Sequence, residues 1–250
     1  MTSTDPGDTA VVALHGADML VRTWERRGSD ASPDAAPAAP AEPPVLLLHA
    51  TGESSLDWAR VAANLRANRT VVALDARGHA GSSRPGSYRL EEMAGDALAV
   101  AGSLPVLAET DVYDVVGHSM GGLVALLVAA TEPRRVRRLV LEDVPLPHPR
   151  TPNPPARPDA DPGFDWEMVL QVRAQIDDPD PGWADVARSV VAPTLVVWGG
   201  PSSPMPAEHV EELARTLPSG RLVRVDAGHL VHATDPDGFL AVVRPFLDAS

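Results

Sequence analysis

The chain lacks two residue types that often carry chemistry, cysteine and lysine. Without cysteine there is no disulfide framework, no thiolate metal site and no cysteine nucleophile. Without lysine the chain cannot form a Schiff base with a carbonyl substrate or with pyridoxal phosphate. All 21 basic residues are therefore arginines, and 34 acidic residues outnumber them.

Long hydrophobic runs and an excess of positive charge are also missing. No apolar stretch approaches the roughly 20 residues that span a bilayer. Residues 1–8 are polar and acidic, unlike a signal peptide. A formal net charge of −13 argues against a nucleic-acid partner and against adhesion to anionic membranes. We expect a soluble cytoplasmic protein that binds neither nucleic acid nor membranes, and the sequence does not indicate its oligomeric state.

The hydrophobic pattern predicts an α/β fold in a single domain over residues 1–250. With 250 residues, 44% of them hydrophobic, the chain can bury a substantial core. We expect eight strands, at residues 11–14, 19–24, 45–49, 70–75, 112–116, 138–143, 194–198 and 221–225. We expect helices at residues 56–67, 89–107, 123–130, 164–176, 183–190, 207–217 and 236–247, the second of them ending near Pro105. This alternation predicts a mostly parallel sheet with helices on both faces.

Two segments interrupt the alternation of strands and helices. Residues 28–44 are a low-complexity run of alanine, proline, serine and aspartate, which predicts a flexible insertion in a surface loop. Residues 144–191 begin with a proline-dense stretch and continue with two short helical patterns. We interpret this second segment as a lid or cap inserted over a binding site.

The rest of the chain is organised around the sequence Gly117-His118-Ser119-Met120-Gly121. A buried strand precedes it and an apolar helix follows it, which is the context of a nucleophile elbow. The tight turn strains Ser119 and exposes its hydroxyl above the sheet, and side chains at the two glycine positions would clash. We therefore predict that Ser119 is a nucleophile and that His118 points away from it. The alternative is a glycine-rich turn without chemistry.

An oxyanion hole is predicted beside this turn. The strand at residues 45–49 ends in His49-Ala50-Thr51-Gly52, upstream of the elbow. The backbone N–H groups of Thr51 and Met120 would face a developing negative charge, while His49 would hydrogen-bond the loop. Ligands of parallel sheets bind beyond the carboxyl ends of the strands. Thr51, Ser119, Asp143 and His229 all follow predicted strands, so we expect them to converge on one edge.

These motifs resemble the α/β-hydrolase fold superfamily, and the resemblance covers the whole chain except residues 28–44. The matching stretches, in the order found in the family, are His49-Ala50-Thr51-Gly52, Asp75-Ala76-Arg77-Gly78-His79, Gly117-His118-Ser119-Met120-Gly121-Gly122 and Ala227-Gly228-His229. The resemblance implies an eight-stranded sheet and a Ser–acid–His triad that requires neither a metal nor an organic cofactor. Ala50 departs from the family pattern, because a glycine usually stands there.

The resemblance also suggests the partners of Ser119. It makes His229 the base, with His232 as the rival. The acid of the family usually follows the strand at residues 194–198, but Ser202 stands in that place and cannot carry a negative charge. Some members, including haloalkane dehalogenases, take their acid from the strand before the lid, and there we assign Asp143.

Two alternatives to Asp143 remain open at this point. Glu142 is the neighbouring carboxylate, but side chains alternate along a strand, so only one of the pair would face the site. The other alternative is that no acid is used and that Ser119 and His229 form a dyad through a water molecule or Ser202.

The prediction is a carboxylesterase-like serine hydrolase that cleaves an ester, a lactone or a related carbonyl through an acyl-enzyme on Ser119. Its partner would be a small-molecule acyl substrate. Ala50, Trp58 and Trp166 are candidates to line the pocket, although either tryptophan fits a core position equally well. A C–C hydrolase, an acyltransferase or a cofactor-free haloperoxidase could use the same triad, and a non-catalytic ligand-binding protein is the alternative from another class.

Overall fold

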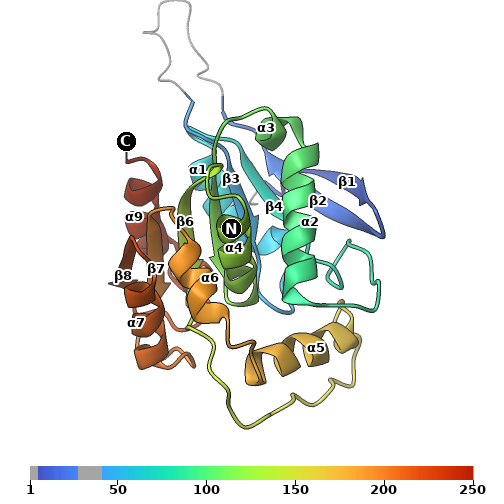
Figure 1. Cartoon of the computed structure of the whole chain (residues 1–250). Helices are drawn as coiled ribbons and strands as arrows, with labels where there is room; N and C mark the ends of the chain where they lie inside the picture. Colours follow the sequence, from blue (N-terminus) through green and yellow to red (C-terminus); the bar gives the residue numbers. More distant parts are fainter. Residues whose placement is uncertain (1–4, 28–40, 250) are drawn as a thin grey trace, which may run out of the picture.

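A computed structural model describes residues 5–27 and 41–249, and its centre is an eight-stranded sheet (Figure 1). The strands are β1 (Asp8–Leu14), β2 (Ala17–Trp24), β3 (Val45–Leu48), β4 (Val71–Leu74), β5 (Tyr113–His118), β6 (Val136–Glu142), β7 (Thr194–Trp198) and β8 (Gly220–Arg224). Their order in the sheet is β1-β2-β4-β3-β5-β6-β7-β8. β1 pairs antiparallel with β2, β2 pairs antiparallel with β4, and all other pairs are parallel. The predicted fold class is confirmed.

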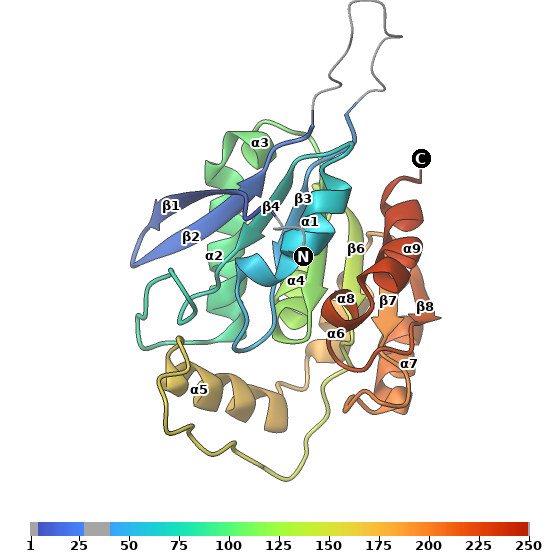
Figure 2. The ribbon, with the colours of Figure 1, turned by 180° about the vertical axis from the view of Figure 1, so that it is seen from behind.

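Helices cover both faces of this sheet (Figures 1 and 2). The helices are η1 (Ser55–Trp58), α1 (Ala59–Leu65), α2 (Leu90–Ser103), α3 (Pro105–Ala108), α4 (Met120–Thr131), α5 (Trp166–Asp177), α6 (Trp183–Ser189), α7 (Ala207–Thr216), α8 (Val231–Thr234) and α9 (Pro236–Leu247). One core cluster joins the sheet to α2, α4, α6 and α7, and a second joins its other face to α1 and α9. Within the described parts of the chain, every helix is too short or too polar to span a bilayer.

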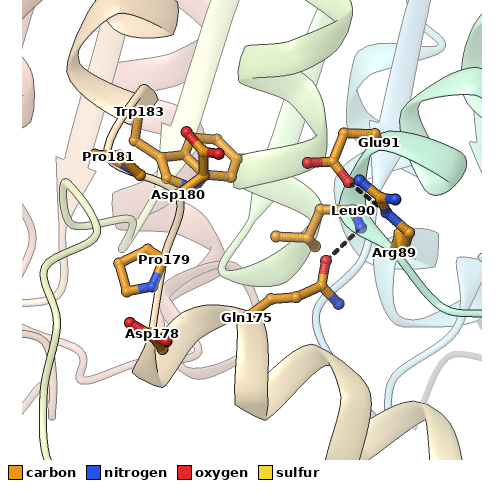
Figure 3. A pocket seen from close by; sticks show the side chains of 9 residues that line it. All are labelled: Arg89, Leu90, Glu91, Gln175, Asp178, Pro179, Asp180, Pro181 and Trp183. Carbon is orange, nitrogen blue, oxygen red and sulfur yellow. Dashed lines mark hydrogen bonds and ion pairs between the residues drawn. The ribbon is translucent and has the colours of Figure 1, made fainter.

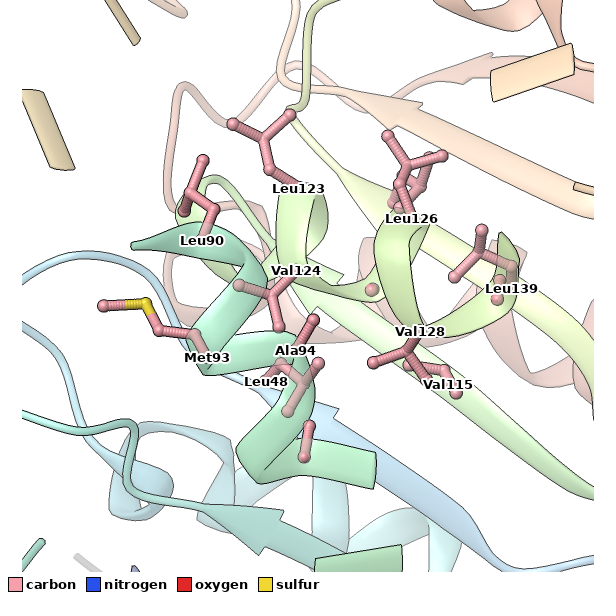
Figure 4. Close-up of a cluster of buried hydrophobic side chains, with 14 of the residues drawn as sticks. Leu48, Leu90, Met93, Ala94, Val115, Leu123, Val124, Leu126, Val128 and Leu139 are labelled. Carbon is pink, nitrogen blue, oxygen red and sulfur yellow. The ribbon is translucent and has the colours of Figure 1, made fainter. Parts of the chain in front are cut away.

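The central strands are buried on both faces because their side chains alternate between the two clusters. In β5, for example, Val115 belongs to the first cluster and Val116 to the second. Figure 4 shows the first cluster, in which side chains of α2 and α4 pack over those of β3, β5 and β6. α4 and β5 are thereby held firmly on either side of the turn that carries Ser119.

Most predicted elements are present, with two differences in the helices. The helix expected over 89–107 is divided into α2 and α3, because Leu104 is extended (φ −84°, ψ 119°) before Pro105, whose ring disfavours a helical residue in front of it. The short α8 was not predicted, since four residues are too few to show a helical period.

The structure describes only part of the first predicted insertion and all of the second. Of the insertion predicted at 28–44, residues 28–40 lie outside the described part of the chain, and residues 41–44 lead into β3 without regular structure. In the segment predicted as a lid, residues 145–165 contain no helix or strand, and α5 follows. α5 lies beyond the carboxyl ends of the parallel strands (Figures 1 and 2).

Candidate active site

Ser119 occupies a strained turn between β5 and α4. Its backbone has φ 51° and ψ −115°, which side-chain-bearing residues rarely adopt. A Cβ at Gly117 would lie 2.3 Å from the carbonyl oxygen of Gly121, and a Cβ at Gly121 would lie 2.4 Å from that of Leu48. Both positions therefore require glycine, for the steric reason that the sequence indicated.

The structure brings Ser119, His229 and Asp143 into one chain of hydrogen-bond contacts. Nε2 of His229 lies 3.1 Å from Oγ of Ser119, and Nδ1 lies 2.7 Å from Oδ2 of Asp143. The Asp143 side chain is fully buried, whereas that of His229 is 27% exposed. The remaining oxygen of Asp143, Oδ1, accepts a hydrogen bond from the N–H of Gly199 at 2.9 Å. Asp143 thus anchors this series of contacts inside the protein, whereas His229 is partly accessible to solvent.

Ser203, which the sequence did not single out, is a further partner of Asp143. Its hydroxyl donates to Oδ2 of Asp143 and accepts the N–H of Met205 at 3.0 Å. Ser202, the residue considered from the sequence, is exposed. Ser202 stands after β7, where the family usually has its acid. The next residue, Ser203, binds the Asp143 carboxylate. Only the path of the loop decides which of the two adjacent serines does so.

The two rival residues, Glu142 and His232, contact each other. Both are buried, and Nδ1 of His232 lies 2.9 Å from each oxygen of Glu142. The N–H of His232 also donates to Oε1 of Glu142 at 2.8 Å. Trp58 is fully buried and stacks on His232, with 4.1 Å between ring centroids. Trp58 therefore occupies the core position that the sequence left open for it.

The loop after β3 has two of its three successive N–H groups engaged. The N–H of Ala50 donates to Oε2 of Glu53 at 3.2 Å, and that of Gly52 donates to Nε2 of His79 at 3.0 Å. The N–H of Thr51 lies between them. His49 holds this loop, because its Nδ1 lies 2.7 Å from the carbonyl oxygen of Ala50 and its Nε2 accepts the N–H of Ala76.

Burial favours the neutral form of both histidines beside this loop. It lowers the pKa of His49, and burial together with the neighbouring His49 lowers the pKa of His79 to about 3. A neutral imidazole can donate at one nitrogen and accept at the other, as His49 does.

His118 points away from Ser119, as expected. Its Nδ1 lies 3.2 Å from Oε2 of Glu53, and its Nε2 lies 2.8 Å from the carbonyl oxygen of His229. Burial lowers the pKa of His118, but the charges of Glu142 and Glu53 and the hydrogen bonds outweigh it and raise the pKa to about 9. Burial acts to raise the pKa of Glu53, but His118 outweighs it and brings this pKa to about 2.

Among the described residues, His118, Glu142 and His232 place potential metal-binding atoms within 4.8 Å of one another. Both nitrogens of His118, however, face oxygen atoms at hydrogen-bond distance. A ring nitrogen that donates a proton to an oxygen has no lone pair for a metal ion. The donor set therefore fits a hydrogen-bonded cluster better than a metal site.

The chain matches the family model described as the α/β-hydrolase fold over residues 43–180. It belongs to this family. It is 28% identical to the sn-1-specific diacylglycerol lipase ABHD11 of Mus musculus, over 82% of this chain and 81% of that protein. It is 26% identical to the pyrrolizixenacetamide deacetylase of Xenorhabdus hominickii, over 82% and 91%. The enol-lactonase of Burkholderia xenovorans LB400 has the same fold, with a TM-score of 0.79 at 22% identity over 96% of this chain and 100% of that one.

In this α/β hydrolase, one aromatic side chain from the segment before α5, that of Phe164, lies near the loop after β3. A ring carbon of Phe164 lies 3.2 Å from where a Cβ of Gly52 would be, and Phe164 stacks with the half-buried Trp166 at 6.4 Å. Ala50 in the same loop is buried. Phe164 was not predicted, because no spacing in the sequence connects residues this far apart.

A separate cavity of about 490 Å³ opens between the start of α2, the end of α5 and the start of α6 (Figure 3). Its lining residues are Arg89, Leu90, Glu91, Gln175, Asp178, Pro179, Asp180, Pro181 and Trp183. They include none of the predicted site residues. We therefore place the candidate chemistry at Ser119 and not in this cavity, on the strength of the hydrogen-bond contacts there.

Proposed function

We propose that this α/β hydrolase is a serine hydrolase that cleaves an ester, a lactone or a related carbonyl through an acyl-enzyme on Ser119. The observation that carries this proposal is the continuous contact from Ser119 through His229 to the buried Asp143. A nucleophile, a base and an acid in this order are what acyl transfer requires.

In the proposed mechanism, Asp143 accepts the Nδ1–H of His229 and thereby selects the tautomer with a free lone pair on Nε2. That lone pair takes the proton of Ser119 as its oxygen attacks the carbonyl carbon. The N–H groups of Thr51 and Met120 stabilise the oxyanion. His229 then protonates the leaving group, and in the second half-reaction it activates the water that hydrolyses the acyl-enzyme.

Two observations support acyl chemistry over a non-catalytic binding role. The non-catalytic alternative depended on the missing acid after β7, and Asp143 supplies a carboxylate to His229 at 2.7 Å. Two relatives are named as a lipase and a deacetylase, and both names refer to acyl substrates. The ring of Phe164 beside the oxyanion loop, stacked with that of Trp166, favours a substrate with an apolar portion.

The test is intact mass after brief treatment with a fluorophosphonate, which phosphonylates only an activated serine. We expect one adduct on the wild type and none on Ser119→Ala. Asp143→Asn, which removes the charge but little volume, should react on the order of 10⁴-fold more slowly, as for other triads that lose the acid. The matched control is Ser202→Ala, an exposed serine that should leave the rate unchanged.

Each other result contradicts part of the proposal. Labelling of Ser119→Ala would place the nucleophile elsewhere. Equal rates for the wild type and Asp143→Asn would remove Asp143 from the mechanism, and a slow Ser202→Ala would favour the dyad. A wild type that neither reacts nor hydrolyses p-nitrophenyl esters would favour the non-catalytic alternative.

A further inference from the structure

His118, next to the nucleophile, has an oxygen acceptor at each ring nitrogen. Nδ1 faces a carboxylate oxygen of Glu53 at 3.2 Å, and Nε2 faces the carbonyl oxygen of His229 at 2.8 Å. Neither an ionised carboxylate nor a carbonyl has a proton to give. Both hydrogen bonds therefore require a proton on the imidazole, and a ring with two protons is a cation.

We propose that His118 is a positioning residue, protonated on both ring nitrogens at neutral pH, that holds the oxyanion loop and the loop carrying the base in place. The inference rests on the proposed function, since it gives these two loops their roles. It assigns no chemical step to His118, whose side chain is buried and points away from Ser119.

These contacts join the loop after β3, the last residue of β5 and the loop after β8. The N–H of Ala50, after β3, donates to Oε2 of Glu53, and the same oxygen faces Nδ1 of His118 at the end of β5. From Nε2 of His118 the contact continues to the backbone of His229, after β8. The side chain of His229 then reaches Ser119 and Asp143 on the other side. Ser119 thus contacts the ring of His229, and His118 contacts the backbone of the same residue.

Glu142 and His232 complete this arrangement on the neighbouring strand. Glu142 immediately precedes Asp143, as His118 precedes Ser119, and it holds the N–H and Nδ1 of His232. The segment 229–232 is therefore held at both ends by the residues that precede the nucleophile and the acid. Each of these pairs therefore joins the last residue of a strand, which holds the segment 229–232, to a residue of the proposed triad that follows it with a positive φ.

The charges around His118 stabilise its cationic form. The titratable groups that face it are Glu53, Glu142, His229 and His232, from the loop before η1, β6, the loop after β8 and α8. The two carboxylates outweigh burial and raise the pKa of His118 to about 9. A raised histidine pKa contributes stability that is fully present below the ordinary value of 6.5 and is lost as the pH rises through about 9.

The first test is the protonation state of His118 in the wild type, read from ring-nitrogen NMR shifts at pH 8. The His118 signals are assigned by their loss in His118→Gln, or from backbone correlations if that variant does not fold. We expect two protonated nitrogens on His118. A single ring proton at pH 8 would overturn the proposal, and this readout requires no enzymatic turnover.

The second test is the pH profile of kcat/KM in the wild type and in Glu53→Gln. We expect kcat/KM of the wild type to decline above about pH 9, because His118 then loses its second ring proton. Removing the charge of Glu53 should move this decline about one to three pH units lower. The matched control is Glu208→Gln, an exposed carboxylate on α7. If kcat/KM declines at the same pH in Glu53→Gln as in the wild type, the positioning role of His118 is overturned.

The two proposals fail in different ways. A wild type without fluorophosphonate labelling would overturn the proposed function and with it the positioning role, whereas the NMR measurement would still decide the charge of His118. If the wild type is labelled but His118 is neutral, only the positioning role of His118 is overturned.

Discussion

At the scale of single residues, Ser119 and Asp143 are both held in backbone conformations that side chains disfavour. Their φ angles are 51° and 52°, at a cost of about 1–3 kcal/mol each. Each is fixed by the next strand of the sheet: the N–H of Ser119 donates to the carbonyl of Glu142 at 3.0 Å, and that of Asp143 to Val197 at 2.7 Å. The sheet therefore maintains the strain that directs both side chains toward His229.

A prediction at this scale concerns Ser203, whose hydroxyl donates to Oδ2 of Asp143. Ser203→Ala should lower kcat about 10- to 100-fold, because a hydrogen bond to a charged group contributes about 1.5–3 kcal/mol. The measurement is the steady-state hydrolysis of a p-nitrophenyl ester, with thermal unfolding to confirm folding. Ser202→Ala is the adjacent control. If the two variants behave alike, Ser203 does not orient Asp143.

At the scale of elements, α5 is attached to the segment before α2 by two glutamines one turn apart. Gln171 accepts the N–H of Tyr88 at 3.0 Å and donates to the carbonyl of Gly86 at 3.1 Å. Gln175 accepts the N–H of Leu90 at 3.0 Å and donates to the carbonyl of Tyr88 at 2.9 Å. These polar contacts join α5 to α2 along the backbone of residues 86–90, as a paired strand would. We expect these contacts to hold α5 in place as part of the predicted lid.

The corresponding prediction is that Gln175→Ala loosens α5 without disturbing the sheet. The two hydrogen bonds lost to Tyr88 and Leu90 cost about 1–3 kcal/mol, so the amides of α5 should exchange about 10- to 100-fold faster. KM should change more than kcat. Hydrogen exchange monitored by mass spectrometry measures the first effect and ester hydrolysis the second. Arg188→Ala, which removes an exposed ion pair on α6, is the control. Unchanged exchange in α5 would show that apolar packing holds the helix.

At the scale of the whole molecule, a buried ion cluster closes the end of the sheet opposite the site. Asp114, at the start of β5, accepts hydrogen bonds from Arg137 at 2.7 and 2.9 Å and from Arg69 at 2.8 Å. Arg137 continues to the carbonyl of Leu247 at the end of α9. The side chains of Asp114 and Arg69 are fully buried. One carboxylate thus links two strands, the segment after α1 and the C-terminal helix.

We predict that Asp114→Asn destabilises the protein by about 3–5 kcal/mol, because it removes the buried carboxylate that pairs with the buried guanidinium of Arg69 and the partly buried one of Arg137. The measurement is the free energy of unfolding in urea. The control Asp185→Asn breaks an ion pair with Arg188 whose side chains are 82% and 62% exposed, and it should cost less than about 1 kcal/mol. The folded fraction of Asp114→Asn should label with fluorophosphonate at the wild-type rate. If Asp114→Asn and Asp185→Asn lower the free energy of unfolding by similar amounts, water reaches the ion cluster around Asp114.

Much of this fold could be predicted from the sequence because its signals are local. Runs such as Val45–Leu48 and Thr194–Trp198 show strands by composition, and the glycines around Ser119 show a turn by their spacing. The short helix Val231–Thr234 escaped prediction, because it is a single turn of backbone, whereas Pro105 indicated where the helix from residue 89 ends. The candidate site was predicted less completely, since Ser203 and Phe164 carry no local signal of their contacts.

The sequence by itself determined the alternation of strands and helices, the elbow at Ser119 and the group of candidate partners. It left Asp143 and Glu142, and likewise His229 and His232, as rivals. Only the tertiary structure paired them, Asp143 with His229 and Glu142 with His232. The reason is that Glu142 is the last residue of β6, whereas Asp143 follows it with a φ of 52°, so the two neighbouring carboxylates meet different histidines. Which carboxylate meets which histidine is decided by the loop after β8 and by the register of β6 against β7, not by any neighbour in the chain.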